Sequence, residues 1–317
     1  MDTIRVEAPA SSANLGPGFD VFALALESPR DSVSLRHEPG GSKVSVRIGR
    51  VTGLDVPRSA DENGACIVCK EMSTRFEVRG NVTVDLDKRV PIGMGLGSSG
   101  ASAAGAAVAM NELLGLGLSQ DELIFHAGKG EGATSGARHY DNVAASILGG
   151  FVVVGAGAKG KPTASRFDPP EDMAVCVATP VVELPKRKTE YARSLLPRSV
   201  PFDSLVANVA NASLMVAGFA KRDIKLIGKG MTDKVVDKAR KSMIPGYDRV
   251  RSEAIGAGAE GVCISGAGPS LLAVVDRERV EPKRVLEAII ASFAKEGAES
   301  SGYVTKVGGG ARVAKNR

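Results

Sequence analysis

The chain has 317 residues, enough for two domains or one large one, and 43% of them are hydrophobic. Its net charge of +5 comes from 41 basic and 36 acidic residues, which are scattered along the chain and form no long run. With no Trp and only 4% aromatic residues, this composition argues against aromatic platforms for single-stranded nucleic acid and against a dense basic stripe for duplexes.

The first ninety residues alternate apolar and polar side chains in four segments, which predict half-buried strands. These segments are TIRVEAP (3–9), DSVSLRHE (31–38), KVSVRIG (43–49) and NVTVDLDK (81–88), with a helix expected over 63–76. A glycine-rich loop then leads into a helix from about Ser99 to Leu114. Further helices are expected from Ser119, an N-cap followed by acidic residues, and over DNVAASIL, which closes on Gly149. FVVVGA (151–156) is expected to be a strand.

After Gly160 the pattern of elements starts again. Strands are predicted over MAVCVATP (173–180), GVCIS (261–265), SLLAVV (270–275) and SGYVTKVG (301–308), and the GAGP between the second and third predicts a hairpin or tight connection. Helices are predicted over 188–196, 202–222, a stretch ending near SMIP (242–245), and 282–297. The layout indicates two α+β halves that meet near residues 150–165.

The four cysteines are too few for a disulfide scaffold of this size. Cys66 and Cys69 form a C-x-x-C that could be redox-active or half of a zinc site, but no second pair completes a zinc ribbon. The segment ACIVCKEM is also typical of the buried face of a helix, the interpretation we favour, in a reducing compartment.

No basic start followed by an apolar run indicates a secretory signal, and no apolar stretch approaches the length needed to span a bilayer. The sequence is therefore expected to be that of a soluble, cytoplasmic protein with no membrane partner.

The loop PIGMGLGSSG (91–100) raises the question of phosphate binding. Glycine amides let a phosphate approach closely, and the following helix adds free N–H groups and its dipole. Ser98 and Ser99 could cap this helix, donate to a phosphate oxygen or bind Mg²⁺. The loop lacks the Lys of a Walker A motif, however, and by itself it could equally be a tight turn into a packed helix.

Three companion segments carry a family resemblance. PASSANLGPGFDVFALAL (9–26), PIGMGLGSSGASAAG (91–105) and GVCISGAGPSLLAVV (261–275) resemble the three signature motifs of the GHMP kinases. The first segment, together with ARHYDNVAASILGGF (137–151), is most similar to the homoserine kinase branch. The resemblance runs from about residue 5 to 310.

This resemblance implies an α+β GHMP kinase fold with two domains. The N-terminal ATP-binding domain (1–155) would be ribosomal protein S5 domain 2-like, and the C-terminal domain (156–317) would be ferredoxin-like. It implies an enzyme of threonine biosynthesis that uses ATP to phosphorylate L-homoserine to O-phospho-L-homoserine. It also implies that the enzyme could be a homodimer.

The resemblance also implies where ATP and Mg²⁺ bind. Ser99 and Glu131 match the positions that hold Mg²⁺, and a hydroxyl with one carboxylate suits that cation. Glu131 could instead be a solvated acid at a helix end. Asn63 matches an adenine contact and could also be a helix N-cap. The loop positions that would wrap the phosphates are Pro91, Ile92, Gly93, Met94, Gly95, Leu96, Gly97, Ser98, Ser99, Gly100 and Ala101.

A zwitterionic substrate needs partners for its ammonium and carboxylate groups. The resemblance implies Asp20, beside Asn14, for the ammonium group and His139 for a further polar contact. Arg193 and Arg240 match the carboxylate-binding arginines, and a guanidinium can bind a carboxylate with two parallel hydrogen bonds. Taken alone, each arginine would more often be a solvated surface charge.

Asn142 and Thr189 match positions near the reacting hydroxyl. No strong general base stands out, because Asp141, the nearest acid, could cap its helix instead. Phosphoryl transfer tolerates this, since positioning and charge neutralisation supply most of the acceleration.

The chain departs from the family pattern at two places. It reads AAS where APA is usual after DNVA, and Gly100 stands where Ala is common, which lowers helix propensity by up to ~1 kcal/mol. Two alternatives stay open: a GHMP kinase for another alcohol, such as mevalonate or shikimate, and a GHMP-fold sensor without catalysis.

Overall fold

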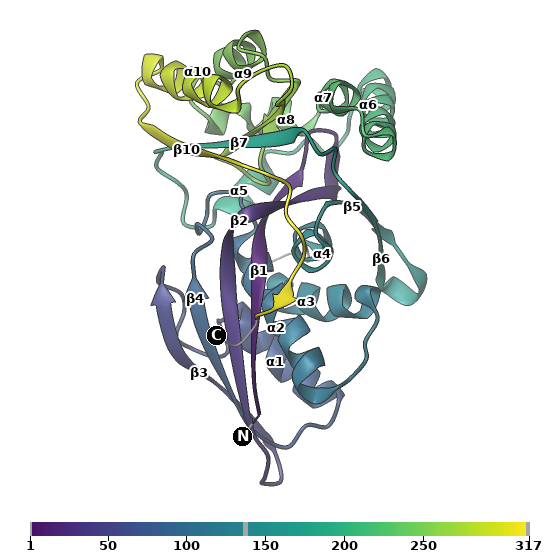
Figure 1. The fold of residues 1–317 in the computed structure, drawn as a ribbon, viewed down its shortest axis with the longest axis vertical. Coiled ribbons are helices and arrows are strands. Elements are labelled where there is room, and N and C mark those ends of the chain that lie inside the picture. Colours follow the sequence, from purple (N-terminus) through teal and green to yellow (C-terminus); the bar gives the residue numbers. More distant parts are fainter. Residues whose placement is uncertain (1, 136–138, 315–317) are drawn as a thin grey trace.

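The computed structural model describes residues 2–135 and 139–314, which form two lobes stacked along the long axis (Figure 1). The first lobe is built on a seven-stranded sheet that includes the path β11–β1–β2–β4–β3, and β5 extends it from β2. Its strands are β1 (Asp2–Asn14), β2 (Gly18–Glu38), β3 (Val44–Gly53), β4 (Gly80–Lys88), β5 (Phe151–Ala156), β6 (Pro162–Phe167) and β11 (Arg312–Val313).

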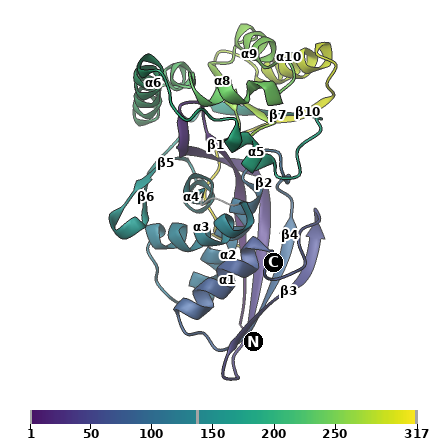
Figure 2. The same ribbon diagram turned by 180° about the vertical axis from the view of Figure 1, so that it is seen from behind.

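Four helices cover one face of this sheet (Figure 2). They are α1 (Gly64–Arg75), α2 (Ser98–Leu114), α3 (Gln120–Ser135) and α4 (Tyr140–Leu148). The central helix, α2, is rich in alanine and buried along most of its length, because small side chains let it lie close to β1 and β2. The core under these helices takes the inward residues of the strands, such as Val33, Leu35, Val82 and Val84.

The second lobe is a four-stranded antiparallel sheet in the order β10–β7–β9–β8. The strands are β7 (Met173–Pro180), β8 (Gly261–Ile264), β9 (Leu271–Asp276) and β10 (Ser300–Thr305), and the helices of this half are α5 (Lys188–Ser194), α6 (Phe202–Lys221), α7 (Ile224–Gly230), α8 (Val236–Arg240), α9 (Tyr247–Gly256) and α10 (Pro282–Lys295). Short 3₁₀ turns, η1 (Ala158–Gly160) and η2 (Lys241–Met243), complete the described elements.

Both faces of this second sheet are covered. Along β7, Ala174 and Cys176 face the cluster under α9 and α10, whereas Val175 and Val177 face the cluster that includes α6 and α7. The strand is therefore buried on both sides, which explains the unbroken apolar run in its sequence.

Strand β2 is 21 residues long and joins the lobes. Its lower half pairs with β1 and β4, and its upper part pairs with β5 through Phe22–Leu24. Phe22 packs edge-on to Phe151 with ring centroids 5.2 Å apart, and Phe151 stacks on Phe219 of α6 at 4.0 Å. These contacts between Phe22, Phe151 and Phe219 hold the second lobe against the first.

Most expected elements are confirmed, including the four early strands, the helix before β4, and the β8–β9 hairpin with its intervening turn. The sequence analysis missed β6, β11, α9 and residues 18–30 of β2. The domain boundary at 155/156 stays a prediction, and the first sheet itself continues through the β5–β6 hairpin to Phe167. All four cysteines are buried and free, and burial above all raises the pKa of Cys66 to about 12, so the C-x-x-C belongs to the core.

One expectation about membranes is wrong. Among the described residues, one helix, α6, is long and apolar enough to cross a bilayer by length and composition alone. Its apolar residues are interrupted by Ser, Asn and Gly, so the run looks short in sequence. Residues 204–220 nevertheless carry no Asp, Glu, Lys or Arg.

Candidate active site

The glycine loop ends at a helix N-terminus that is open to a cavity. Gly97 is the N-cap of α2 with φ +64°, and no side chain caps the helix there. The amides of the first turn have no acceptor within the helix, so they are available to an anion. The Ser98 hydroxyl donates to the Val90 carbonyl oxygen at 2.8 Å, whereas Ser99 turns towards Glu131.

A buried ion pair supports this loop from behind. Lys88, at the end of β4, and Asp31, on β2, are 3% and 1% exposed, and their charged groups bond directly. The Lys88 amine also donates to the Ser98 carbonyl oxygen at 2.5 Å, and Asp31 accepts the backbone N–H of Val90 at 2.9 Å. Burial lowers the pKa of Lys88, while Asp31 opposes that shift. The pair thus fixes both ends of the loop to the sheet.

The three sequence motifs converge at one place. The Ser265 hydroxyl, in the β8–β9 turn, donates to the Gly95 carbonyl oxygen at 2.7 Å and lies 2.8 Å from the Ser12 hydroxyl of β1. The Asn14 amide donates to the Gly266 carbonyl oxygen at 2.7 Å. These bonds join segments more than 150 residues apart, so they need the folded chain.

A cavity of about 750 Å³ lies between the lobes at this junction. The predicted residues that line it are Asn14, Asp20, Asn63, Ile92, Gly93, Gly95, Gly97, Ser98, Ser99, Glu131, His139, Asn142, Thr189, Arg193 and Arg240. The remaining predicted loop residues, Pro91, Met94, Leu96, Gly100 and Ala101, do not line it, and the side chains of Leu96 and Ala101 pack in the core. The segment 137–151 enters the site from His139 onwards, since residues 137 and 138 lie outside the described part.

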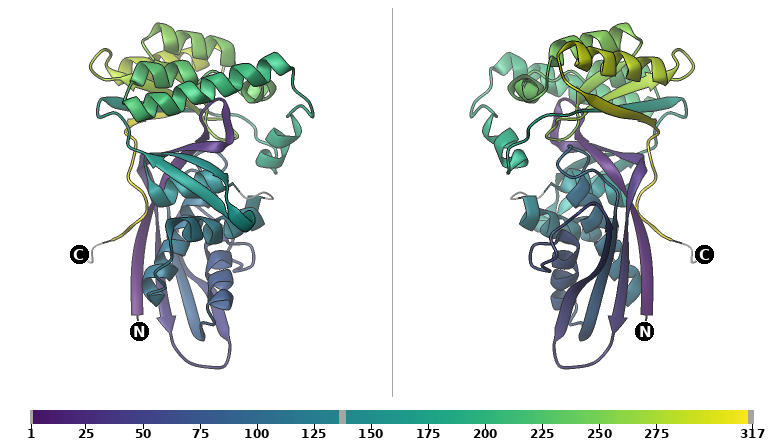
Figure 3. Two further views of the ribbon diagram at one scale, coloured as in Figure 1. Left: turned by 90° about the vertical axis from the view of Figure 1, so that its right-hand side faces the viewer. Right: turned by 90° about the vertical axis from the view of Figure 1, so that its left-hand side faces the viewer.

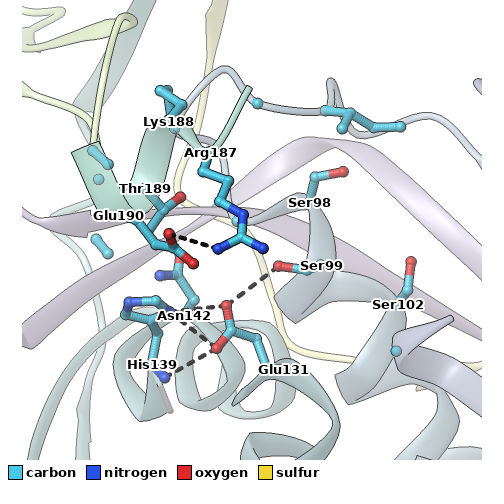
Figure 4. A pocket seen from close by; sticks show the side chains of 18 of the residues that line it. Ser98, Ser99, Ser102, Glu131, His139, Asn142, Arg187, Lys188, Thr189 and Glu190 are labelled. Carbon is cyan, nitrogen blue, oxygen red and sulfur yellow. Dashed lines mark hydrogen bonds and ion pairs between the residues drawn. The ribbon is translucent and has the colours of Figure 1, made fainter. Parts of the chain in front are cut away.

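Ser99, Glu131 and His139 form a connected set on the cavity wall (Figure 4). The Ser99 hydroxyl lies 3.3 Å from Glu131 Oε1, and His139 Nδ1 lies 3.0 Å from the same carboxylate. Glu131 is only 4% exposed, so it is not a solvated acid at a helix end. Burial opposes charge on the His139 ring, but Glu131 and the nearby Asp141 and Asp20 outweigh it and raise the pKa of His139.

Asp20 and the two arginines lie together at the other end of the cavity. Arg193, on α5, donates to both oxygens of Asp20 at 3.0 Å, and each side chain keeps over a third of its surface exposed. Arg240 is 3% exposed and donates to the carbonyl oxygens of Ala192 and Gly266. Both guanidinium groups lie just over 5 Å from the ring of Phe19. Neither arginine is therefore an ordinary solvated surface charge.

Asn142 lies between the two ends of the cavity. It is on α4, and its Oδ1 accepts the Ser11 hydroxyl at 2.9 Å, while Thr189 approaches from α5 above (Figure 4). Asp141 does not cap α4, because His139 is the N-cap residue and Asp141 lies in the first turn. Burial above all raises the pKa of Asp141 to about 7, with Asp20 and Glu131 adding to the rise.

Asn63 is the N-cap of α1 and also lines the cavity. Its Oδ1 accepts the backbone N–H groups of Ala65 and Cys66, and its Nδ2 donates to the Pro57 carbonyl oxygen at 3.2 Å. The cap is therefore observed, and the adenine contact stays a prediction.

Sequence reasoning missed several groups at this site. Lys188 is 9% exposed and donates to the Gly268 carbonyl oxygen, and burial together with Arg240 lowers the pKa of Lys188 to about 8. Lys88 and Lys186 also line the cavity, as does Arg187. In the sequence, these residues stand in charged runs that are usually solvated, and no local signal separates a buried lysine from an exposed one.

Comparisons with known proteins agree with this architecture. Residues 63–150 match the family described as GHMP kinases N terminal domain, and residues 215–298 match GHMP kinases C terminal. The chain is 38% identical to homoserine kinase from Haloarcula marismortui, over 98% of this chain and 99% of that protein. It is 39% identical to the homoserine kinase of Halorubrum lacusprofundi, with the same two coverages. The crystal structure of homoserine kinase from Cytophaga hutchinsonii superposes with a TM-score of 0.88 at 33% identity, covering 99% of this chain and 98% of that one.

Proposed function

Because the chain belongs to the homoserine kinases of the GHMP kinase family, we propose that it transfers the γ-phosphoryl group of ATP to the side-chain hydroxyl of L-homoserine. The product is O-phospho-L-homoserine, an intermediate of threonine biosynthesis. The observation that supports the proposal is that an open helix N-terminus, an aspartate and two arginines line the same cavity.

The nucleotide would bind at the α2 end of the cavity. Amides around Gly95 to Ser99 and the dipole of a 17-residue helix favour the triphosphate. The Lys88–Asp31 pair holds the loop in place, so the amides keep their orientation before ATP arrives. Asn63 would lie beside the adenine while it continues to cap α1.

A magnesium ion would accompany the nucleotide, and the residues present fit it. The Ser99 hydroxyl and the Glu131 carboxylate are both oxygen donors in one cavity, and Mg²⁺ takes its remaining ligands from water and phosphate. No cluster of three or more acidic, His or Cys side chains suited to a metal occurs among residues 2–135 and 139–314. When bound, the cation neutralises charge on the phosphates.

The amino-acid substrate would bind where Asp20 and Arg193 now pair. Its ammonium group would meet Asp20 and its carboxylate would meet Arg193 and Arg240. Asp20 and Arg193 would then each exchange one opposite charge for another. This exchange limits the desolvation cost of opening the pair. His139 and Asn14 add polar contacts at the edges of the same space.

The chemical step requires positioning more than a strong base. The acceptor oxygen bonds to the γ-phosphorus as the bond from that phosphorus to the bridging oxygen breaks, and the hydroxyl proton can pass to an oxygen of the transferred group. Asn142 and Thr189 would orient the hydroxyl. Asp141, whose pKa is raised to about 7, lies next to Asn142 and adds negative charge there above neutral pH.

A coupled assay of ADP release tests the proposal with L-homoserine, L-serine, mevalonate, shikimate and galactose as acceptors. We expect turnover with L-homoserine and little with the alcohols that lack an ammonium group, because they bring no positive charge that could replace Arg193 at Asp20. Turnover on mevalonate without turnover on L-homoserine would refute the substrate while keeping the kinase.

A sensor without catalysis would behave differently. Calorimetry would then detect Mg-ATP binding, and no acceptor would give turnover. We further propose that the enzyme is cytoplasmic and forms a homodimer. Its partner is the small-molecule substrate, and it binds neither nucleic acid nor a membrane.

A further inference from the structure

Lys188 is a buried cation on the cavity wall that has no carboxylate partner. It is the first residue of α5, which reaches down from the second lobe beside the helices of the first (Figure 3). The residue is 9% exposed, and its amine donates to the Gly268 carbonyl oxygen. Within the described part of the chain, that oxygen is its one hydrogen-bond acceptor, and no Asp or Glu forms an ion pair with it. An ammonium group has three donors, so two of them are left for a ligand.

A buried positive charge in this state favours the binding of an anion. Burial, together with the nearby Arg240, disfavours the charged amine and lowers the pKa of Lys188 to about 8. Lys88 is just as deeply buried, but its charge is balanced by Asp31. An anion entering the cavity would supply the counter-charge that Lys188 lacks, and its attraction to the amine would be strong because the surroundings exclude water.

The Lys188 amine lies where the β8–β9 turn touches the glycine loop. Its acceptor, Gly268, belongs to that turn, and a Cβ built on Gly95 would lie 2.9 Å from the same carbonyl oxygen. The turn and the loop are further joined by the hydrogen bond from Ser265 to the Gly95 carbonyl oxygen. One backbone oxygen therefore contacts both the amine and the loop, which places the amine beside the proposed phosphate site.

The charges around the cavity favour a phosphoryl group over a carboxylate as the ligand of Lys188. Residues 91–101 of the glycine loop contain no basic side chain, so their amides alone leave much of the triphosphate charge unbalanced. Lys88, behind the loop, is already neutralised, and the exposed Arg187 pairs with Glu190. The substrate carboxylate, in contrast, already has two guanidinium groups to meet, those of Arg193 and Arg240.

The neighbour of Lys188 in the chain indicates which phosphate it reaches. Thr189 is the residue that we place near the reacting hydroxyl, and it follows Lys188 in the first turn of α5. Figure 4 shows Lys188 above Thr189, on the opposite side of the cavity from Glu131 and His139. An amine between the glycine loop and the acceptor site lies where the terminal phosphate must pass.

We propose that Lys188 is a further catalytic residue, which binds the γ-phosphoryl group of ATP during its transfer and supplies from α5 the cation that the glycine loop lacks. This inference rests on the proposed function. As the acceptor oxygen bonds to the γ-phosphorus, the bond to the bridging oxygen breaks and its electron pair stays on ADP. The ammonium group keeps its protons and donates hydrogen bonds to the oxygens of the transferring group, so it stabilises their negative charge throughout the step.

The first test is Lys188→Met, which removes the charge and nearly keeps the length of the side chain. We expect kcat to fall about 100-fold or more, while KM for L-homoserine changes less than about threefold. Lys225→Met is the matched control, because it removes the same charge from the same lobe at an exposed position outside the cavity, and it should keep the kcat of the wild type. Circular dichroism should be the same for all three proteins.

Calorimetry with a non-hydrolysable ATP analogue and with ADP, each with Mg²⁺, locates the contact without turnover. Lys188→Met should weaken binding of the analogue about 10-fold and leave binding of ADP nearly unchanged, because ADP lacks the γ-phosphoryl group. The thermal unfolding midpoint of the nucleotide-free variant should match or exceed that of the wild type, since a buried charge without a counter-ion is removed. A lysine with a merely structural role would lose stability together with activity.

Chemical rescue tests the charge itself. The thiol of Lys188→Cys can be alkylated with 2-bromoethylamine, which rebuilds a side chain of lysine length that ends in an ammonium group, or with iodoacetamide, which gives a neutral amide. We expect the first reagent to restore kcat at least about 10-fold and the second to restore none of it. The four native cysteines are buried and should not react, which the same treatment of the wild type checks.

Several outcomes would overturn the proposal. A rise in KM for L-homoserine without a fall in kcat would assign the amine to the substrate carboxylate, and equal losses of ADP and analogue binding would assign it to the inner phosphates. Full activity of Lys188→Met, or equal rescue by both reagents, would remove the charge from the mechanism. If the wild type binds the analogue but does not turn over L-homoserine, the proposed function fails, and the calorimetry still tests the contact between Lys188 and the γ-phosphoryl group.

Discussion

Replacing Gly95 by Ala tests how closely the glycine loop must approach the β8–β9 turn. Gly95 has φ +78°, and a Cβ there would lie 2.2 Å from the Ser265 carbonyl oxygen and 2.9 Å from that of Gly268. Gly93 is the internal control, because it has φ +77° in the same loop and an added Cβ would meet nothing within 4 Å. Both substitutions carry the same backbone strain, and only one carries the clash.

The expected magnitudes follow from these distances. Left-handed φ for an L-residue costs about 1–2 kcal/mol, which is the whole effect expected for Gly93→Ala. Gly95→Ala must also move the loop away from a backbone carbonyl, by about 1 Å, and lose the Ser265 hydrogen bond, worth ~1 kcal/mol. We therefore expect Gly95→Ala to lower the free energy of unfolding by about 3–4 kcal/mol. A displacement of this size in the phosphate-binding amides should lower kcat/KM for ATP about 100-fold.

Urea unfolding of the two variants and steady-state kinetics at saturating L-homoserine measure these effects. Gly93→Ala should keep most of its activity at a modest loss of stability. If both variants lose activity and stability equally, the contact between the loop and the β8–β9 turn does not position the amides, and this reasoning is wrong.

Three further predictions follow from ionised groups. Asp20→Asn should raise KM for L-homoserine by about 10–100-fold, because it weakens a hydrogen bond to a charged group, while KM for ATP stays nearly constant. A change in KM for ATP alone would place Asp20 at the nucleotide. Lys88→Met should lower the free energy of unfolding by about 3–5 kcal/mol, because it leaves the Asp31 carboxylate buried without its cation. The double variant Lys88→Met/Asp31→Asn should recover much of that loss, because the amide removes the charge and keeps an oxygen that can accept the backbone N–H groups of Arg89 and Val90; urea denaturation compares the two. Burial above all raises the pKa of Asp237, on α8, to about 7. The folded state therefore binds more protons than the unfolded state between pH ~4 and ~7. As pH rises through that window, the wild type should lose a few kcal/mol of stability relative to Asp237→Asn. Parallel stability curves for these two proteins from pH 5 to 8 would contradict the assigned ionisation.

The local structure and the family motifs could be predicted from the residue pattern alone. Alternation with a period of two residues located β1 to β4, because each strand buries one face, and the GAGP turn located the β8–β9 hairpin. The glycine loop followed by an alanine-rich segment located α2 to within one residue. Short elements escaped: β11 has two residues and is a strand only because it pairs with Val6 and Glu7.

The pairing of charged side chains depends on how the chain packs in three dimensions. Lys88 and Asp31 are 57 residues apart, and Arg193 and Asp20 are 173 apart, so no local pattern could pair them or separate Lys88 from a solvated lysine. Helix and strand patterns depend on neighbours in the chain, so the elements could be predicted from the sequence. Burial and ion pairing depend on packing between distant segments, so the arrangement of the site is seen only in the folded structure.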